Sequence, residues 1–275
     1  MARLMDRRVL GANQQEIRSN NSERGKVYHM MRWKYAAVSA FALAFVLGLG
    51  LAAAPAHAVL EDGQAPNTLT EEQEAEGWRL LFDGEDPARH WRGYNRDDLP
   101  AGWQVDEDGW LVLADTDAGG DIITLEEFDD FDLFMEWKIS DGGNSGIFYF
   151  AQEVSGSIWH SAPEYQILDN DPDTNPIQAA GALYDLVGPE EDVTNPAGEI
   201  NTARIIKNGS QLEHYMNGEL LLSIEVHGDT WNHLVENSKF DEHPFAETDE
   251  GHIGLQDHGD WVAYRSIMIR ELDEE

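Results

Sequence analysis

The chain of 275 residues contains no cysteine. Disulfide bonds and a lipid-modified N-terminal cysteine are therefore excluded, and the folded protein must be held together by its core alone. The sequence also has no Gly-rich phosphate loop, no His-Glu-x-x-His zinc motif and no Gly-x-Ser-x-Gly serine-hydrolase motif. No strand-like run carries three acidic residues at alternate positions, so the paired carboxylates of a retaining glycosidase are not evident.

Basic residues are scarce. The chain has 18 Lys and Arg against 53 Asp and Glu, a net charge of -35. Residues 1–58 hold eight of the basic residues and three of the acidic ones, which leaves 10 basic and 50 acidic residues for the rest. Such an acidic body repels nucleic acid and anionic membranes, favours neutral or cationic ligands and permits weak binding of divalent cations. Salt adaptation or simple solubility is the alternative explanation.

Residues 31–58 have the pattern of a secretory signal. A basic start, Met31 to Lys34, precedes the apolar run Tyr35 to Ala54, and the small-x-small pattern of a cleavage site ends at Ala58. We expect cleavage after Ala58, a periplasmic or secreted protein and no stable membrane insertion. The run is longer than a usual signal core, so an uncleaved anchor is the alternative. Residues 1–30 form a polar extension. If translation begins at Met30 or Met31, just before the apolar run, this extension is not made.

The rest of the chain is predicted to be a short leader followed by strands. Residues 59–74 form the leader, which begins as a disordered segment and ends in a helix capped by Thr70. Two Asn-Gly pairs, at 208–209 and 217–218, indicate tight hairpins. About a dozen strand-like runs with few helices predict an all-β domain over residues 75–273. We expect a jelly-roll sandwich of two antiparallel sheets.

The run from Pro163 to Asp169 is the most informative part of this domain. A strand points alternate side chains to opposite faces, so Glu164 and Gln166 share one face. A core would not need these polar residues, whereas a sheet that binds a sugar would. Glu164 is the best acid/base candidate. Asp169 is either a turn former or a metal ligand.

Two further strand-like runs present polar pairs. Glu136 and Lys138 share a face, either as a solvated ion pair or with Lys138 as a cation that polarises a carbonyl or stabilises an enolate. Gln256 and His258 also alternate together, and Asp257 between them could orient the histidine or bind a metal.

Four other residues complete the candidate site. Asn144 follows a glycine turn, and its amide can both donate to and accept from a sugar hydroxyl. Trp159 and Tyr184 could stack on a pyranose ring, although large aromatic residues are more often found in a core. His160 is a further candidate beside Trp159. We expect one hollow to gather the main polar residues, namely Glu164, Gln166, Lys138, Gln256 and His258.

Several motifs occur together and in order. They are Gly77–Gly84, Gly143–Phe148, Pro163–Asp169, Gly181–Tyr184, His214–Gly218, Ser238–Phe240 and Gly251–Gly259. The set resembles the 3-keto-disaccharide hydrolase family, also described as 3-keto-glucoside 1,2-lyase–hydratase and formerly as domain of unknown function 1080. The similarity covers about residues 75–273 and implies a concanavalin-like jelly roll. One departure is Arg265-Ser266-Ile267, where relatives tend to have Arg-Asn-Ile.

The resemblance implies cleavage of glycosides already oxidised at C3, by proton abstraction at C2, elimination at C1 and addition of water. Such a substrate implies an upstream sugar 3-dehydrogenase. We expect Glu164 or His258 as the base, Lys138 or a divalent metal such as Ca²⁺ as the enolate stabiliser, and Tyr184 or His258 as the acid. The expected sugar contacts are Asn144, Gln166, Gln256, Glu136, Trp159 and His160, and the possible metal ligands are Asp169 and Asp257.

Three other functions remain open. The domain could be a non-catalytic carbohydrate-binding module, because jelly rolls serve both purposes. It could be an ordinary glycosidase, which would release sugar from an unoxidised substrate, or a structural protein of the cell envelope with no affinity for saccharides.

Overall fold

A computed structural model of the protein describes residues 59–61 and 63–272. The predicted signal segment 31–58 and the extension 1–30 lie outside these residues. The described part is mainly strands, with two short α-helices, α2 (Glu71–Ala75) and α3 (Asp229–Glu236). Its 3-10 helices are η1 (Pro87–Arg89), η2 (Thr116–Ala118), η3 (Ile158–His160) and η4 (Pro176–Gln178). None of the helices in this part of the chain has the length and apolar content that a bilayer crossing requires.

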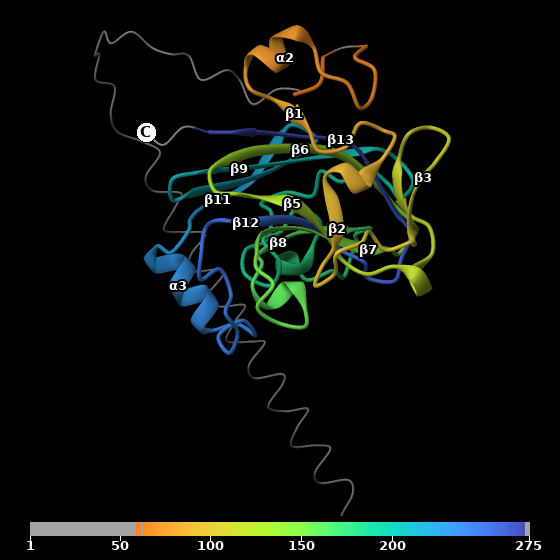
Figure 1. The fold of residues 1–275 in the computed structure, drawn as a ribbon. Coiled ribbons are helices and arrows are strands. Elements are labelled where there is room, and N and C mark those ends of the chain that lie inside the picture. The colour runs from red at the N-terminus through yellow and green to blue at the C-terminus, as the bar shows by residue number, and fades with distance from the viewer. Residues whose placement is uncertain (1–58, 62, 273–275) are drawn as a thin grey trace, which may run out of the picture. The chain divides into compact units, whose positions relative to one another are not determined.

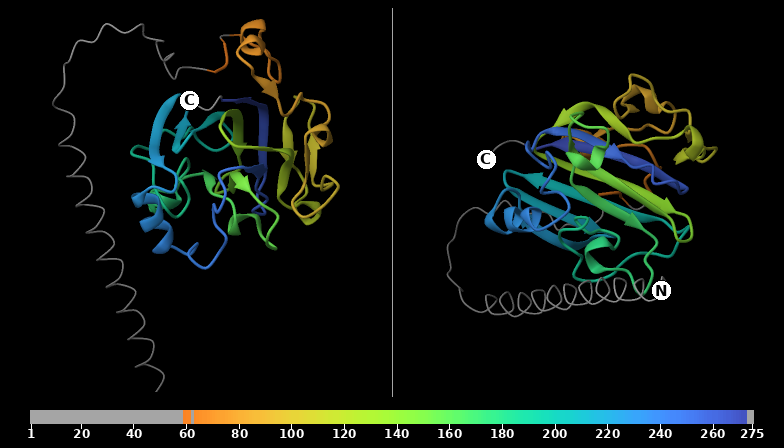
Figure 2. Two further views of the ribbon diagram at one scale, coloured as in Figure 1. Left: turned by 60° about the vertical axis from the view of Figure 1, so that its left-hand side comes forward. Right: turned by 90° about the horizontal axis from the view of Figure 1, so that it is seen from below.

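The strands form two antiparallel sheets (Figure 1). The eight-stranded sheet has the order β11 (Glu219–Glu225), β10 (Gln211–Met216), β9 (Asn201–Asn208), β6 (Phe131–Ile139), β13 (Val262–Glu271), β4 (Leu111–Leu113) and β3 (Trp103–Val105), with β1 (Arg79–Leu80) beside β13. The five-stranded sheet has the order β2 (Trp91–Gly93), β5 (Ile122–Phe128), β12 (Gly251–Leu255), β7 (Asn144–Ala151) and β8 (Glu164–Leu168). Figure 2 shows this sandwich from two further sides. The predicted all-β jelly roll of two antiparallel sheets is confirmed.

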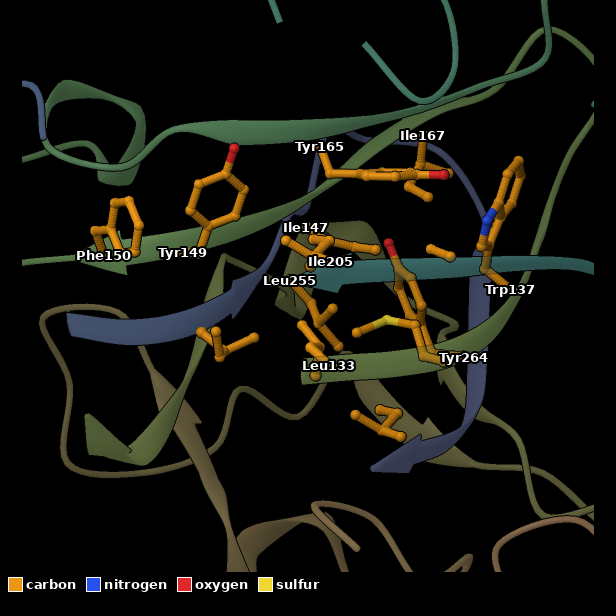
Figure 3. Packing of buried hydrophobic residues seen from close by; sticks show 14 of the residues in the cluster. Leu133, Trp137, Ile147, Tyr149, Phe150, Tyr165, Ile167, Ile205, Leu255 and Tyr264 are labelled. Atoms are coloured by element: carbon orange, nitrogen blue, oxygen red, sulfur yellow. The ribbon is translucent and has the colours of Figure 1, made fainter. Parts of the chain in front are cut away.

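The two sheets enclose one large apolar core. Tyr165 and Ile167 of β8 lie on one side of it, and Leu133 and Tyr264 of the eight-stranded sheet lie on the other (Figure 3). Each of these side chains is at most 1 % exposed. Because side chains alternate along a strand, the even-numbered residues of β6 and β8 must point away from the core. The polar pairs of these two strands therefore lie on opposite outer faces of the sandwich.

The local turn signals are confirmed. The first Asn-Gly pair joins β9 to β10 and the second joins β10 to β11, each as an antiparallel hairpin. Thr70 caps α2, because its side chain accepts a hydrogen bond from the backbone N–H of Gln73. These elements depend on neighbouring residues only, so local sequence suffices to predict them.

The prediction of a disordered segment before α2 is wrong. Val59 and Leu60 pack against an apolar cluster on the outer face of the eight-stranded sheet. Asn67 ties the segment to this sheet, since its Oδ1 accepts from the backbone N–H of Ser266 at 2.7 Å and its Nδ2 donates to Gly109 O at 2.9 Å. Ser266 has a φ of +50°, a left-handed conformation that asparagine adopts more readily than serine.

Candidate active site

Glu164 and Gln166 lie on the outer face of the five-stranded sheet, yet they are only 7 % and 2 % exposed. The loop after η4 lies beside β8. Its backbone pairs with β8, since the N–H of Tyr184 donates to Glu164 O and the N–H of Gly181 donates to Gln166 O. The polar side chains predicted from alternation are therefore buried, and the loop extends the sheet beyond β8.

The neighbouring strands leave room for the Glu164 carboxyl group. Gly146 of β7 lies opposite Gln166 in the register, and the backbone N–H of Gln256 donates to Gly146 O. A Cβ atom at Gly146 would lie 2.3 Å from Glu164 Oε1. A side chain at this position would therefore displace the Glu164 carboxyl group, which occupies the space above the glycine. Asn144, two residues earlier on β7, shares this face.

Burial raises the pKa of Glu164 to about 8. The Lys239 ammonium and a hydrogen bond from the Gln256 side chain work against this rise, whereas Asp121 and Asp185 add to it. The carboxyl group is therefore neutral at pH 7 and close to the point at which it can both take and release a proton. Burial also raises the pKa of Asp121, to about 6.

Lys239 supplies the cation of this face. Its Nζ lies 4.2 Å from the ring centroid of Tyr184, 5.1 Å from that of Phe240 and 5.2 Å from that of Trp159. It also lies 3.8 Å from the Asp185 carboxylate. Sequence reasoning missed Lys239 as a site residue, although Ser238-Lys-Phe240 was one of the family motifs. Asp121 was also missed, and its sequence context gave no signal beyond the two preceding glycines.

Aromatic side chains extend the site beyond Lys239. The Trp159 ring packs edge-on against those of His160 and His243, with centroids 4.1 and 4.9 Å away, and the two histidine rings stack at 4.0 Å. Tyr184 is half-buried, and burial raises the pKa of its phenol, which therefore stays protonated and able to donate. We use the name Glu164 cluster for Glu164, Gln166, Asn144, Gln256, Tyr184 and Lys239.

The prediction that Lys138 and Glu136 share a hollow with Glu164 is wrong. Both lie on the outer face of the eight-stranded sheet, on the other side of the core. Lys138 Nζ lies 4.3 Å from the ring centroid of Trp110. Glu136 accepts two hydrogen bonds from Arg265, at 2.7 and 3.0 Å. Both residues are therefore satisfied by structural partners far from the Glu164 cluster.

His258 is not brought into the Glu164 cluster either. Strand β12 ends at Leu255, so the expected alternation does not continue to His258. The side chain is exposed, and it makes no hydrogen bond or ion pair with any residue that the structure describes.

The acidic residues proposed as metal ligands bind backbone amides. Asp169 accepts from the N–H of Gly142 at 2.9 Å, and Asp257 accepts from those of Gly120 and Gly259 at 2.7 and 2.9 Å. Nowhere in residues 59–61 and 63–272 do three His, Asp or Glu side chains gather closely enough to hold a metal ion. This donor set does not fit the predicted divalent metal. Asp257 instead fixes the loop that carries Asp121, whose Oδ1 accepts from the N–H of Asp257.

Residues 77–270 match the model of the 3-keto-alpha-glucoside-1,2-lyase-like domain. The chain belongs to this family. A curated relative from Bacteroides thetaiotaomicron, named 3-keto-disaccharide hydrolase, is 39 % identical over 235 residues, which cover 73 % of this chain and 80 % of the relative. The resemblance expected from the motifs is thereby confirmed.

Solved structures from Parabacteroides distasonis are also similar. One, named as a proposed glycosyl hydrolase, is 32 % identical with a TM-score of 0.70, covering 76 % of this chain and all of that one. Another with the same name is 27 % identical with a TM-score of 0.53, covering 71 % of this chain and 84 % of that one. The fold of these solved structures therefore agrees with the two-sheet sandwich of this chain.

Proposed function

We propose that this protein, a glycoside-cleaving hydrolase by its family and its curated relative, acts on glycosides whose sugar carries a ketone at C3. The observation that carries the proposal is the Glu164 carboxyl group. This group is buried, and its pKa is about 8. The Lys239 ammonium acts to lower that pKa, and Lys239 also contacts the ring of Tyr184, whose phenol stays protonated. A base, a cation and an acid are the three groups that elimination from a 3-keto-sugar needs.

The first half of the reaction is an elimination. A ketone at C3 acidifies the proton on C2, and the Glu164 carboxylate removes it. The electron pair moves to the C3 oxygen, and the Lys239 ammonium stabilises the resulting enolate. The enolate then collapses, the C1–C2 double bond forms and the C1–O bond breaks. The Tyr184 phenol protonates the departing oxygen, which leaves as an alcohol.

The second half adds water to the enone. The Tyr184 phenolate takes a proton from water, and the hydroxide bonds to C1. Glu164 returns its proton to C2, so both residues regain their starting forms. One water molecule is consumed in total, and the products are the free 3-keto-sugar and the alcohol.

A second candidate, an ordinary glycosidase, is favoured by one observation. Asp121, whose pKa is raised to about 6, acts electrostatically on Glu164, whose pKa is about 8. Two carboxyl groups with separated pKa values are the usual arrangement of a general acid and its ionised partner. Such an enzyme would not require a ketone in its substrate.

The two candidates differ in the substrate they require. We expect the purified, folded protein to release alcohol from methyl 3-keto-glucoside, and not from methyl glucoside. In D₂O, recovered 3-keto-substrate or product should carry deuterium at C2. Release from methyl glucoside would support the glycosidase. Inactivity on both anomers of both compounds, with circular dichroism showing a folded protein, would reject both candidates.

We also propose a periplasmic or secreted location and supply of the substrate by a sugar 3-dehydrogenase. The location rests on the signal pattern of residues 31–58, and the dehydrogenase rests on the chemistry of the substrate, since the ketone must be installed first. Cell fractionation with an antibody against residues 59–272 tests the location. Recovery of the protein in the cytoplasmic fraction alone would contradict it.

A further inference from the structure

Three amide oxygens on the outer face of the five-stranded sheet are buried without a hydrogen-bond donor. They are Asn144 Oδ1, Gln166 Oε1 and Gln256 Oε1, and no residue that the structure describes donates to them. Only five side-chain atoms in the described part of the chain are buried in this way, so three of the five lie together. Each buried acceptor without a donor costs about 1–3 kcal/mol of stability. Three of them on one face are therefore unfavourable for the folded protein unless a ligand pairs with them.

A hydrogen bond of its amide nitrogen fixes which way Gln166 points. Gln166 Nε2 donates to the backbone oxygen of Gln178 at 3.3 Å, and that oxygen can only accept. In Gln166 the nitrogen is therefore used within the protein and the oxygen is left free. In Gln256 the amide oxygen is likewise the buried side-chain atom without a partner among the described residues.

The three acceptors lie around Glu164. Gln166 and Gln256 are on the two sides of β7, and neighbouring strands are about 4.8 Å apart. Between them Gly146 has no side chain, and the Glu164 carboxyl group lies in the space above it. Asn144 is on the same face of β7. A molecule that reaches Glu164 therefore meets acceptors on both sides of it.

We infer that Asn144, Gln166 and Gln256 form a row of acceptors for the hydroxyl groups of the sugar ring. The inference rests on the proposed function and identifies which residues determine its specificity. A 3-keto-glucoside keeps three free hydroxyl groups, on C2, C4 and C6, and each can donate to one amide oxygen. A deoxy or O-methylated sugar leaves an acceptor unpaired, and sites built to bind a hydroxyl reject such analogues strongly.

The first test compares stability with activity. Asn144→Leu and Gln166→Met remove an acceptor while keeping the side-chain volume similar. We expect kcat/KM on methyl 3-keto-glucoside to fall about 10–100-fold in both variants. The melting temperature of Asn144→Leu should stay the same or rise, because an unpaired polar atom is lost. Gln166→Met also loses the hydrogen bond to the backbone oxygen of Gln178, so the stability comparison uses Asn144→Leu.

Asn201→Leu is the matched control. Asn201 is 1 % exposed, but its Oδ1 accepts from the backbone N–H of Asn195 at 2.7 Å and from Asn217 Nδ2 at 2.8 Å. This variant should lose stability because paired groups are left without a partner. If Asn144→Leu lowers the melting temperature as much as Asn201→Leu, the amide is structural and the inference is overturned.

The second test uses sugar analogues. Wild-type kcat/KM should be at least about tenfold lower on the 4-deoxy and 6-deoxy 3-keto-glucosides than on the parent. In Asn144→Leu or Gln166→Met, the penalty against one of these analogues should shrink to within about threefold. Penalties that are the same in the variants as in the wild type would overturn the inference.

A binding measurement separates this inference from the proposed function. If no 3-keto-glycoside is turned over, calorimetric titration with unoxidised methyl glucoside replaces the kinetic comparison. Binding by the wild type that weakens at least about tenfold in both variants supports the row of acceptors even though the proposed function fails. Equal binding by all three proteins, or none by the wild type, overturns the inference.

Discussion

The two outer faces of the sandwich carry similar residues but treat them differently. On the eight-stranded sheet, Glu136 is paired with Arg265, and Asp132 accepts from both Arg204 and Arg270. On the five-stranded sheet, Glu164 is equally buried but has no ion-pair partner in the described part of the chain. The first face shows how this protein satisfies buried charge for structural purposes. The second shows where it leaves a buried carboxyl group without an ion pair.

This difference separates a cluster paired for stability from the one that we propose to act on the substrate. A buried carboxylate without a cation is unfavourable, so the group takes up a proton and its pKa rises. A sequence under selection for stability alone would pair Glu164 or replace it, as it has paired Glu136. Perturbed pKa values with a stated physical cause concentrate at functional sites. The contrast between the two glutamates can be tested directly.

The largest difference is expected between Glu164→Gln and Glu136→Gln. Loss of the base should lower kcat/KM about 10²–10⁴-fold, whereas Glu136→Gln should leave the activity of the folded protein within about threefold of the wild type. Glu136→Gln should instead lower the free energy of unfolding by about 1.5–3 kcal/mol, because hydrogen bonds to a charged group are weakened. Steady-state kinetics and urea unfolding measure the two effects. Equal losses of activity would remove the distinction between the faces.

The two lysines provide the next comparison. Lys239→Met should lower kcat about 10²–10³-fold, because the cation that stabilises the enolate is lost. Lys138→Met should leave kcat unchanged and lower the free energy of unfolding by less than about 1 kcal/mol, the value of a cation–π contact with Trp110. If the two variants lose the same activity, Lys239 has no special role.

Gly146→Ala tests the space that Glu164 occupies. The new Cβ would push the carboxyl group aside, and we expect kcat/KM to fall about 10–100-fold, as happens when a reacting group is misplaced. Gly156→Ala is the control, since a Cβ at this exposed glycine meets no atom within 4 Å and its φ is not positive. The same loss in both variants would point to a general effect of removing glycine.

Among the effects on activity, the shift in the pH profile of kcat/KM should be the smallest. As a base, Glu164 must be ionised, so kcat/KM should rise with pH and level off above about 8. Since Lys239 lowers the pKa of Glu164, Lys239→Met should move this rise to higher pH. A profile that instead falls above pH 8 would make Glu164 the acid.

Stability should depend on pH through the same group. In the folded protein Glu164 keeps its proton up to about pH 8, whereas the unfolded chain loses it near the ordinary value of 4.5. The folded state therefore binds more protons in this window, and the free energy of unfolding falls as pH rises from about 4.5 to about 8. Glu164→Gln lacks this loss, so its melting temperature should exceed that of the wild type at pH 8.5 by more than at pH 5. A constant difference would mean that Glu164 is not protonated when buried.

Alternation along the strands correctly placed half of the site. Asn144 and Gln166 join Glu164 because β7 and β8 are neighbours in one sheet. Gln256 follows β12 directly, and its backbone N–H still pairs with Gly146 of β7. The same rule failed for Lys138. A period of two shows that a side chain leaves the core, but not which of the two sheets its strand joins. That choice depends on pairing with β9 and β13, which are distant in the sequence.

Lys239 could not be found by periodicity. It lies after α3 in a segment without strand or helix pattern. Its place is fixed by contacts with Trp159 of η3 and Tyr184 of the loop after η4, which are both distant in the sequence. The hairpins and the α2 cap were predictable because each depends on a few adjacent residues. The site was only partly predictable because half of it is assembled by loops.

The packing of Val59 and Leu60 against Trp78 has a practical consequence for experiments. This contact lies on the outer face of the eight-stranded sheet, whereas the Glu164 cluster lies on the opposite side of the molecule. A solid support coupled to this face would therefore leave the Glu164 cluster directed away from the support. Biosensor and immobilised-reactor formats should use this end of the domain for attachment.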